Sequence, residues 1–152
     1  MENNRINLYR GKTKNTGKWV YGYLYQIELP NGLATMILTG DKCGVELFDD
    51  EKRDYDLGFK MDVDMFIVDK ETVGQFVCLD CKDNYMFEGD IVRTRVTNDR
   101  FKKNPRFENL VISYDEKYGK WENGRFGTFY PQRMEVIGNI HDNPELLNKH
   151  EI

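Results

Sequence analysis

A basic segment at residues 93–107 has the chemistry of a phosphate-binding surface. It holds six positive charges against one negative charge, that of Asp99. Lysine and arginine neutralise phosphates, and aromatic rings between them can stack on bases. The residues of this predicted nucleic-acid-binding surface are Arg93, Arg95, Arg100, Phe101, Lys102, Lys103 and Arg106. The alternative is a solvated loop that balances the acidic segment at residues 49–56.

A Cys-x-x-Cys motif, Cys78 to Cys81, has the spacing at which one turn offers two thiolates to zinc. A tetrahedral site needs two more ligands. Cys43, His141 and His150 are present, but no second pair has ligand spacing. We therefore expect ordinary thiols at the end of a strand, with no metal and no other cofactor.

Carboxylates are abundant, but their spacing indicates no acid–base pair. Asp62 and Asp64 share one face of a predicted strand and could bind a divalent cation. Glu88-Gly89-Asp90 is typical of a turn, in which glycine supplies backbone freedom and aspartate accepts amide hydrogen bonds. The chain lacks phosphate-loop, dinucleotide and zinc-protease motifs. We expect no enzyme, although a deep pocket gathering Asp62, Asp64, Asp90 or His141 would favour one.

Composition limits the other possibilities. The 152 residues fit one domain or two small lobes, and the net charge of −4 gives no global attraction to nucleic acid or anionic lipid. No apolar run approaches the ~18–20 residues of a membrane helix. The first ten residues do not resemble a secretion signal, and the cysteine count is odd, so we expect a cytoplasmic protein without a membrane partner.

The dominant periodicity is two, which predicts strands. Aromatic residues make up 13% of the chain, so we expect rings to fill much of the core. The predicted strands are residues 6–10, 19–29, 33–39, 45–48, 61–68, 71–79, 91–97, 110–114, 120–122, 128–130 and 134–140. Residues 110–114 and 120–122 are expected to form a hairpin. Pro30-Asn31-Gly32 predicts a tight turn between residues 19–29 and 33–39. Short strands separated by such turn signals favour a sandwich or small barrel over a doubly wound α/β sheet.

The C-terminal end changes character. Asn143 can cap a helix, Pro144 suits its first position, and Glu145 favours its positive end. A helix of about eight residues does not persist alone in water, so it must dock on the sheet or on a second subunit.

Three pairs of segments together resemble the YopX family of phage and prophage proteins. They are residues 6–10 with 19–22, 71–76 with 87–92, and 135–140 with 143–147. They span essentially the whole chain. Residues 77–84 depart from the family pattern, and Cys78 and Cys81 lie where that pattern has no cysteine, which argues further against zinc.

The resemblance implies a mainly β fold. It implies an SH3-like small barrel in residues 70–152, with a short C-terminal helix and a β-rich N-terminal lobe at residues 1–69. It transfers no activity and no catalytic residue. The leading hypothesis is a non-enzymatic binding or assembly module whose partner is an unknown protein or a second copy, giving a homo-oligomer. The alternatives are a nucleic-acid-binding protein that uses residues 93–107, and a small phage enzyme or inhibitor of a host factor.

Overall fold

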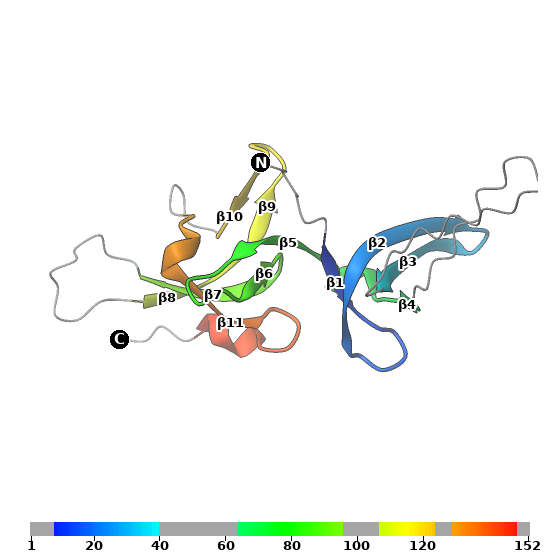
Figure 1. Ribbon diagram of the computed structural model, residues 1–152, viewed down its shortest axis with the longest axis horizontal. Coiled ribbons are helices and arrows are strands. Elements are labelled where there is room, and N and C mark those ends of the chain that lie inside the picture. Colours follow the sequence, from blue (N-terminus) through cyan, green and yellow to red (C-terminus); the bar gives the residue numbers. More distant parts are fainter. Residues whose placement is uncertain (1–7, 40–63, 96–106, 124–128, 149–152) are drawn as a thin grey trace, which may run out of the picture. The chain divides into compact units, whose positions relative to one another are not determined.

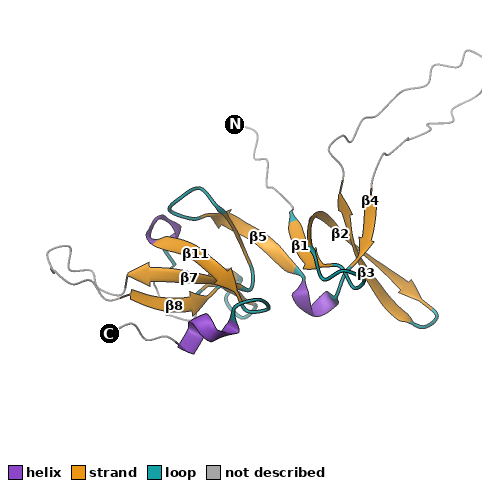
Figure 2. Cartoon of the chain, turned by 90° about the horizontal axis from the view of Figure 1, so that it is seen from below, coloured by secondary structure: helices purple, strands orange, loops and turns teal. Residues whose placement is uncertain are grey.

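The computed structural model describes residues 8–39, 64–95, 107–123 and 129–148 (Figure 1). In these residues the secondary structure consists of antiparallel strands and 3₁₀ helices of three to five residues (Figure 2). The mainly β prediction is therefore confirmed. The chain divides into two compact units, an N-terminal unit, Leu8–Val73, and a C-terminal unit that begins at Gly74.

The N-terminal unit is built on an antiparallel sheet in the order β4-β3-β2-β1. The strands are β1 (Tyr9–Lys12), β2 (Trp19–Leu29), β3 (Gly32–Thr39) and β4 (Asp64–Ile67), and the 3₁₀ helix η1 (Lys70–Thr72) follows. The two-residue turn Pro30-Asn31 joins β2 to β3, as its sequence predicted. The two-residue alternation of side chains and this turn signal therefore located the strands at 19–29 and 33–39 correctly.

The sheet of the N-terminal unit curls, so that the residues after β1 bond to the end of β4 without a closed ladder between the two strands. An isolated bridge joins Thr13 to Val68, and the Lys14 amide donates to the Ile67 carbonyl at 3.1 Å. Ile37 and Val68 are fully buried inside the curl. Gly22 is required here, because a Cβ atom would overlap the backbone carbonyl of Leu38. The curl therefore rests on close contact between backbones as well as on apolar packing.

The C-terminal unit holds three smaller groups of strands. β5 (Gly74–Leu79) pairs with β6 (Tyr85–Phe87), and β9 (Ser113–Asp115) pairs with β10 (Lys120–Glu122). A three-stranded sheet has the order β11-β7-β8, from Met134–Asn139, Asp90–Arg95 and Phe107–Val111. The 3₁₀ helices are η2 (Pro131–Arg133) and η3 (Pro144–Asn148). No sheet in the described residues closes on itself, so the structure does not confirm an SH3-like barrel.

Aliphatic and methionine side chains, not rings, form most of the core. Met86, Val92, Ile112 and Met134 make the buried cluster of the C-terminal unit. Among the described residues, Phe87 is the aromatic residue in the fully buried set. The expectation of a ring-filled core was wrong for this part of the chain, because many tyrosines lie on the surface instead.

Several predicted boundaries also need correction. The strand expected at 71–79 begins only at Gly74, because Asp69 accepts from the Glu71 amide and starts η1. Leu110 belongs to β8 and pairs with β7, so the hairpin partner of 120–122 is 113–115. Ile112 separates the two strands, because its amide and carbonyl bond the turn at Gly89 and Asp90.

Near the C-terminus the differences concern helices. Phe129 and Tyr130 form no strand, since η2 begins at Pro131. The expected helix of about eight residues is the five-residue η3, with an i to i+3 hydrogen bond from the Leu146 amide to the Asn143 carbonyl. No helix in the described residues is long and apolar enough to span a membrane. The strand predicted at 45–48 lies outside the described residues.

Candidate binding surface

The turn that carries the Cys-x-x-Cys motif is organised by Asp80. This carboxylate is buried and accepts from the amides of Lys82 at 2.8 Å, Asn84 at 2.9 Å and Val136 at 2.9 Å. Burial raises the pKa of Asp80, but these hydrogen bonds, led by the one from Val136, bring the pKa below its usual value. The side chain therefore fixes the β5–β6 turn to β11 as a buried, charged hydrogen-bond acceptor.

The two cysteines of this turn differ from each other. Cys78 is half-buried at the core, whereas Cys81 is exposed. Burial, and then the nearby charge of Asp80, raise the pKa of the Cys78 thiol. In the part of the chain that the structure describes, no group of three or more His, Cys, Asp or Glu side chains could hold a metal ion.

The segment Glu88-Gly89-Asp90 forms the turn that its sequence predicted. The Phe87 amide donates to the buried Asp90 carboxylate at 2.7 Å, and Gly89 has a φ of +81°, which favours glycine. Asp90 is thus held inside the C-terminal unit as a structural acceptor. Asp64 is exposed at the start of β4, and Asp62 lies outside the described residues.

The predicted basic surface is described only at its first residues. Arg93 and Arg95 lie on β7, and the Arg93 guanidinium stacks 4.9 Å from the centre of the Phe107 ring. Glu135 lies opposite Arg93 in the neighbouring strand. The remaining predicted residues, Arg100, Phe101, Lys102, Lys103 and Arg106, lie outside the described residues. The nucleic-acid surface therefore stays a prediction.

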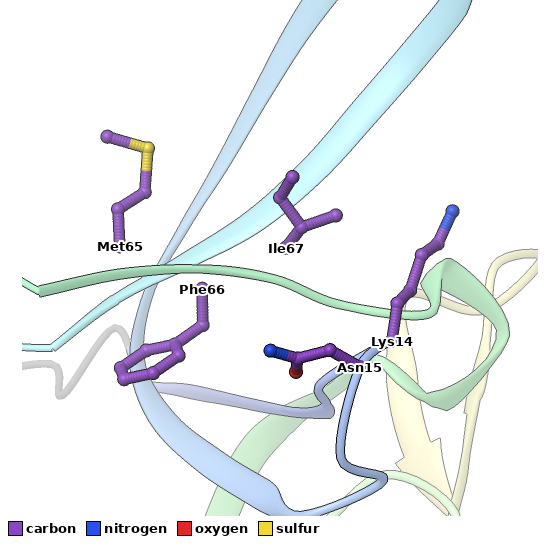
Figure 3. A pocket seen from close by; sticks show the side chains of 5 residues that line it. All are labelled: Lys14, Asn15, Met65, Phe66 and Ile67. Carbon is purple, nitrogen blue, oxygen red and sulfur yellow. The ribbon is translucent and has the colours of Figure 1, made fainter.

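A pocket of about 370 Å³ lies beside β4 in the N-terminal unit. Its lining residues are Lys14, Asn15, Met65, Phe66 and Ile67 (Figure 3). Met65 and Ile67 project from one side of the strand, and Phe66 projects from the other (Figure 3). The carboxylates and the histidine that would have favoured an enzyme are not among the described residues that line it.

In the described part of the N-terminal unit, most of the exposed large apolar side chains lie on one face of β2. Every second residue from Tyr21 to Leu29 is a large apolar residue, and all five are exposed. Tyr23 has 65% of its surface accessible. Since alternate residues of a strand point to the same side, these five side chains form one continuous stripe.

The stripe continues across the neighbouring strands. In the sheet register, Tyr23 lies opposite Leu38, which lies opposite Met65. Tyr25 is likewise followed by Met36 and then by Ile67. Directly opposite residues in antiparallel strands share a face. We call this surface the tyrosine face and define it by its exposed members, Tyr21, Tyr23, Tyr25, Ile27, Leu29, Met65 and Ile67.

The tyrosine face reaches the area of the largest apolar patch on a typical monomer. Its three tyrosines are between 48% and 65% exposed, and rings of this size have roughly 200 Å² each, so together they expose about 300 Å². The four aliphatic members add to that area. A typical monomer has its largest apolar patch at about 300–600 Å², and such patches often bind a partner.

Sequence reasoning located β2 but not the direction in which its rings point. One side of the strand carries Tyr21, Tyr23 and Tyr25, and the other side begins with Val20 and includes Leu24. Both sides are therefore apolar over the first half of the strand. In the second half of the strand, Gln26 and Glu28 alternate with Ile27 and Leu29. All four residues are exposed, so this alternation does not show which side is buried.

Comparisons with known proteins give a family and one structural neighbour. The family model described as "YopX protein" matches residues 8–148. The crystal structure of protein EF1440 from Enterococcus faecalis resembles this chain at a TM-score of 0.48 with 16% sequence identity, over 93% of this chain and 98% of that chain. A likeness at this level supports no inference about function. A comparison with curated proteins gives no match.

Proposed function

Since the chain belongs to the YopX family over nearly its whole length, we propose that it is a non-enzymatic assembly module in which the tyrosine face binds a second copy of the same chain. The observation that carries this proposal is the exposure of seven large apolar side chains on one face of one sheet. Exposed apolar surface of this kind is stabilised when a partner removes it from water.

The area of the tyrosine face fits a protein interface. A standard interface buries about 800 Å² on each partner. The three tyrosines already expose about 300 Å², more than a third of that area. Tyrosine is also enriched at such interfaces, because its ring is apolar and its hydroxyl group can remain in contact with water.

The chemistry of this face favours protein over nucleic acid. The cross-strand rows of Tyr23 and Tyr25 contain no lysine or arginine, and the row of Tyr21 contains Arg10, which is buried. A surface for single-stranded nucleic acid combines stacking rings with a cationic track. A second copy is favoured because an apolar face can pack on an identical face about a two-fold axis, the symmetry by which most soluble oligomers assemble.

Sedimentation equilibrium of the full chain tests this proposal. We expect the wild type to associate reversibly and the Tyr23→Ser, Tyr25→Ser double variant to be monomeric. The control is Tyr118→Ser, which replaces a tyrosine that is 60% exposed in the C-terminal unit and should leave association unchanged. A wild type that is strictly monomeric at high concentration, or an equal loss in the control, would overturn the proposal.

Other features inferred from the sequence remain predictions. They are the SH3-like barrel in the C-terminal half, the cytoplasmic location and the prophage origin. The two alternative functions, nucleic-acid binding through residues 93–107 and a small enzyme or inhibitor, also stay predictions.

A further inference from the structure

Among the described residues, one edge of β2 has no strand partner over more than half of its length. β1 covers β2 only at Trp19–Gly22, with Tyr9 opposite Gly22 and Lys12 opposite Trp19. From Tyr23 to Leu29, no strand among the described residues pairs with β2 on this side. Figures 1 and 2 show β2 and β3 continuing beyond β1 and β4 as a two-stranded ribbon. A two-stranded ribbon alone is marginally stable in water.

The hairpin geometry shows which backbone groups face this edge. A two-residue turn makes Leu29 and Gly32 a hydrogen-bonded pair, and such pairs alternate along an antiparallel ladder. Tyr25 and Ile27 therefore direct their amides and carbonyls toward β3. The backbone groups of Leu24, Gln26 and Glu28 point to the open side. The same alternation directs the Thr35 carbonyl toward β4, where it accepts from the Val68 amide at 3.0 Å.

The open edge lacks the usual protection against pairing. Soluble proteins protect edges with lysine, proline or a bulge. Between residues 23 and 29 the single charged side chain is Glu28, and there is no proline. The pairing with β3 runs without a register shift, so no bulge turns the edge away. This edge therefore offers another strand a continuous row of backbone donors and acceptors, with one charged side chain beside it.

We propose that the open edge of β2 pairs antiparallel with β2 of a second copy, with Gln26 opposite Gln26 of the partner subunit. This inference rests on the proposed function and specifies its geometry. Pairing about Gln26 is the symmetric register that engages all seven residues, Tyr23–Leu29, on both chains. It places Leu24 opposite Glu28 of the partner subunit, so the two glutamates do not face each other.

This register also joins the two tyrosine faces. Tyr25 lies beside Ile27 of the partner subunit, and Tyr23 lies beside Leu29 of the partner subunit. Opposite residues share a face, so the aromatic side chains of one copy pack against the aliphatic side chains of the other. The pairing satisfies the open edge and buries the sides of these residues that meet at the seam, and the two tyrosine faces become one continuous face of a larger sheet.

Cysteine cross-linking tests the register directly. In a chain whose Cys43, Cys78 and Cys81 are replaced by serine, Gln26→Cys should form an intermolecular disulfide under mild oxidation. Hydrogen-bonded antiparallel pairs have Cα atoms about 5.5 Å apart, within disulfide range. The control Asn31→Cys, at the tip of the same hairpin, should not cross-link, because the two copies of that position lie roughly 33 Å apart.

A proline variant tests the backbone contact. Gln26→Pro removes an amide that points to the open edge, and with it two hydrogen bonds across the two-fold axis. We expect the dissociation constant of the dimer to rise about tenfold to a hundredfold. Gln26→Ala is the control. Both variants lose the side-chain bond from Gln26 to Thr35, but only proline loses the backbone donor.

The outcomes separate the two proposals. Cross-linking at position 26 alone, with weakening by proline alone, supports edge pairing. A wild-type dimer that Tyr23→Ser, Tyr25→Ser dissociates, but that shows no cross-link at position 26, would overturn edge pairing and leave the assembly function standing. A monomeric wild type would overturn both. If Gln26→Pro disturbs folding, measured by circular dichroism, the cross-linking result decides.

Discussion

The β5–β6 turn of the C-terminal unit and the β2–β3 hairpin of the N-terminal unit place their side chains in opposite ways. In the turn, Asp80 is buried and its oxygens accept four hydrogen bonds from the same chain. In the hairpin, Tyr23 and Tyr25 lie in water while the backbone edge beside them has no strand partner among the described residues. The turn is satisfied within its own chain, whereas the hairpin gains most from a contact outside it.

In the C-terminal unit, the sequence motifs shared with the YopX family make contacts within the chain. Gly138 lies in β11 where a Cβ atom would come within 2.6 Å of Asn143 Oδ1 and 2.9 Å of Leu146 Cδ1. η3 is held there, because Asn109 Nδ2 donates to the Leu146 carbonyl at 2.7 Å. The recognisable residues of the C-terminal unit therefore serve packing, which explains why they suggested a family without suggesting an activity.

Among these variants, replacing Gly22 by alanine should destabilise the β2–β3 hairpin most strongly. The new methyl group meets the backbone carbonyl of Leu38, which cannot move without separating β2 from β3. We expect the free energy of unfolding to fall by about 3 kcal/mol or more, measured by urea denaturation. Gly138→Ala meets the ends of side chains instead and should cost less. A larger loss in Gly138→Ala would contradict this ranking.

Replacing Asp80 by asparagine tests how far the β5–β6 turn depends on hydrogen bonds within its own chain. The amide of the new residue would face the donors of Val136 and Asn84, so we expect a loss of about 2 kcal/mol in unfolding free energy at pH 7. Asp83→Asn, on the exposed surface of the same turn, is the control and should change little.

The effect of Asp80 should also depend on pH. Folding lowers its pKa below the ordinary value of 3.8, so its stabilisation is complete above that value and is lost as the pH falls through the folded pKa. The difference between wild type and Asp80→Asn should therefore be constant between pH 7 and pH 5 and shrink in stronger acid. A difference that grows on acidification would contradict the assignment.

The two cysteines of the turn should react at different rates. Burial and the Asp80 charge raise the Cys78 pKa, which lowers its thiolate fraction, whereas Cys81 is exposed. We expect iodoacetamide to modify Cys81 about tenfold faster at pH 8, measured by peptide mass spectrometry. Equal rates would show that the turn opens readily and is less rigid than the hydrogen bonds of Asp80 indicate.

Salt should have the smallest effect. The rows that include Tyr23 and Tyr25 contain no charges, so the dissociation constant of the dimer should change little between 50 and 200 mM salt. Nucleic-acid binding behaves differently, because salt weakens contacts to phosphates steeply. Binding of short single-stranded DNA that falls with salt and is lost in Arg93→Ala, Arg95→Ala would instead support the basic segment as the functional surface.

Local patterns were sufficient to predict much of the sheet but little of what joins its parts. The alternation in β2 and the Pro30-Asn31 turn are local signals, and they placed that hairpin correctly. The bond between Asp80 and the Val136 amide spans 56 residues and has no signal in either segment alone. The 3₁₀ helix at Lys70–Thr72 depends on one side-chain cap, so it was read as strand.

The candidate site was missed for a different physical reason. Aromatic composition predicts burial on average, but it does not specify which tyrosines a small core can hold. The interior of the N-terminal unit is narrow, with Gly11 within 3.2 Å of Val68 and Ile37 if it carried a Cβ atom. Rings do not fit there, so Tyr21, Tyr23 and Tyr25 project outward. Only the three-dimensional packing shows this limit.

The open edge of β2 has a consequence for handling the protein. A strand that can extend a sheet in one defined register can also extend it with partly unfolded neighbours, and such growth ends in fibres rather than in closed particles. Heating a concentrated preparation should therefore produce thioflavin-positive aggregates that start from residues 23–29. The substitution Gln26→Lys, on the side of β2 that faces away from the tyrosines, should oppose this aggregation.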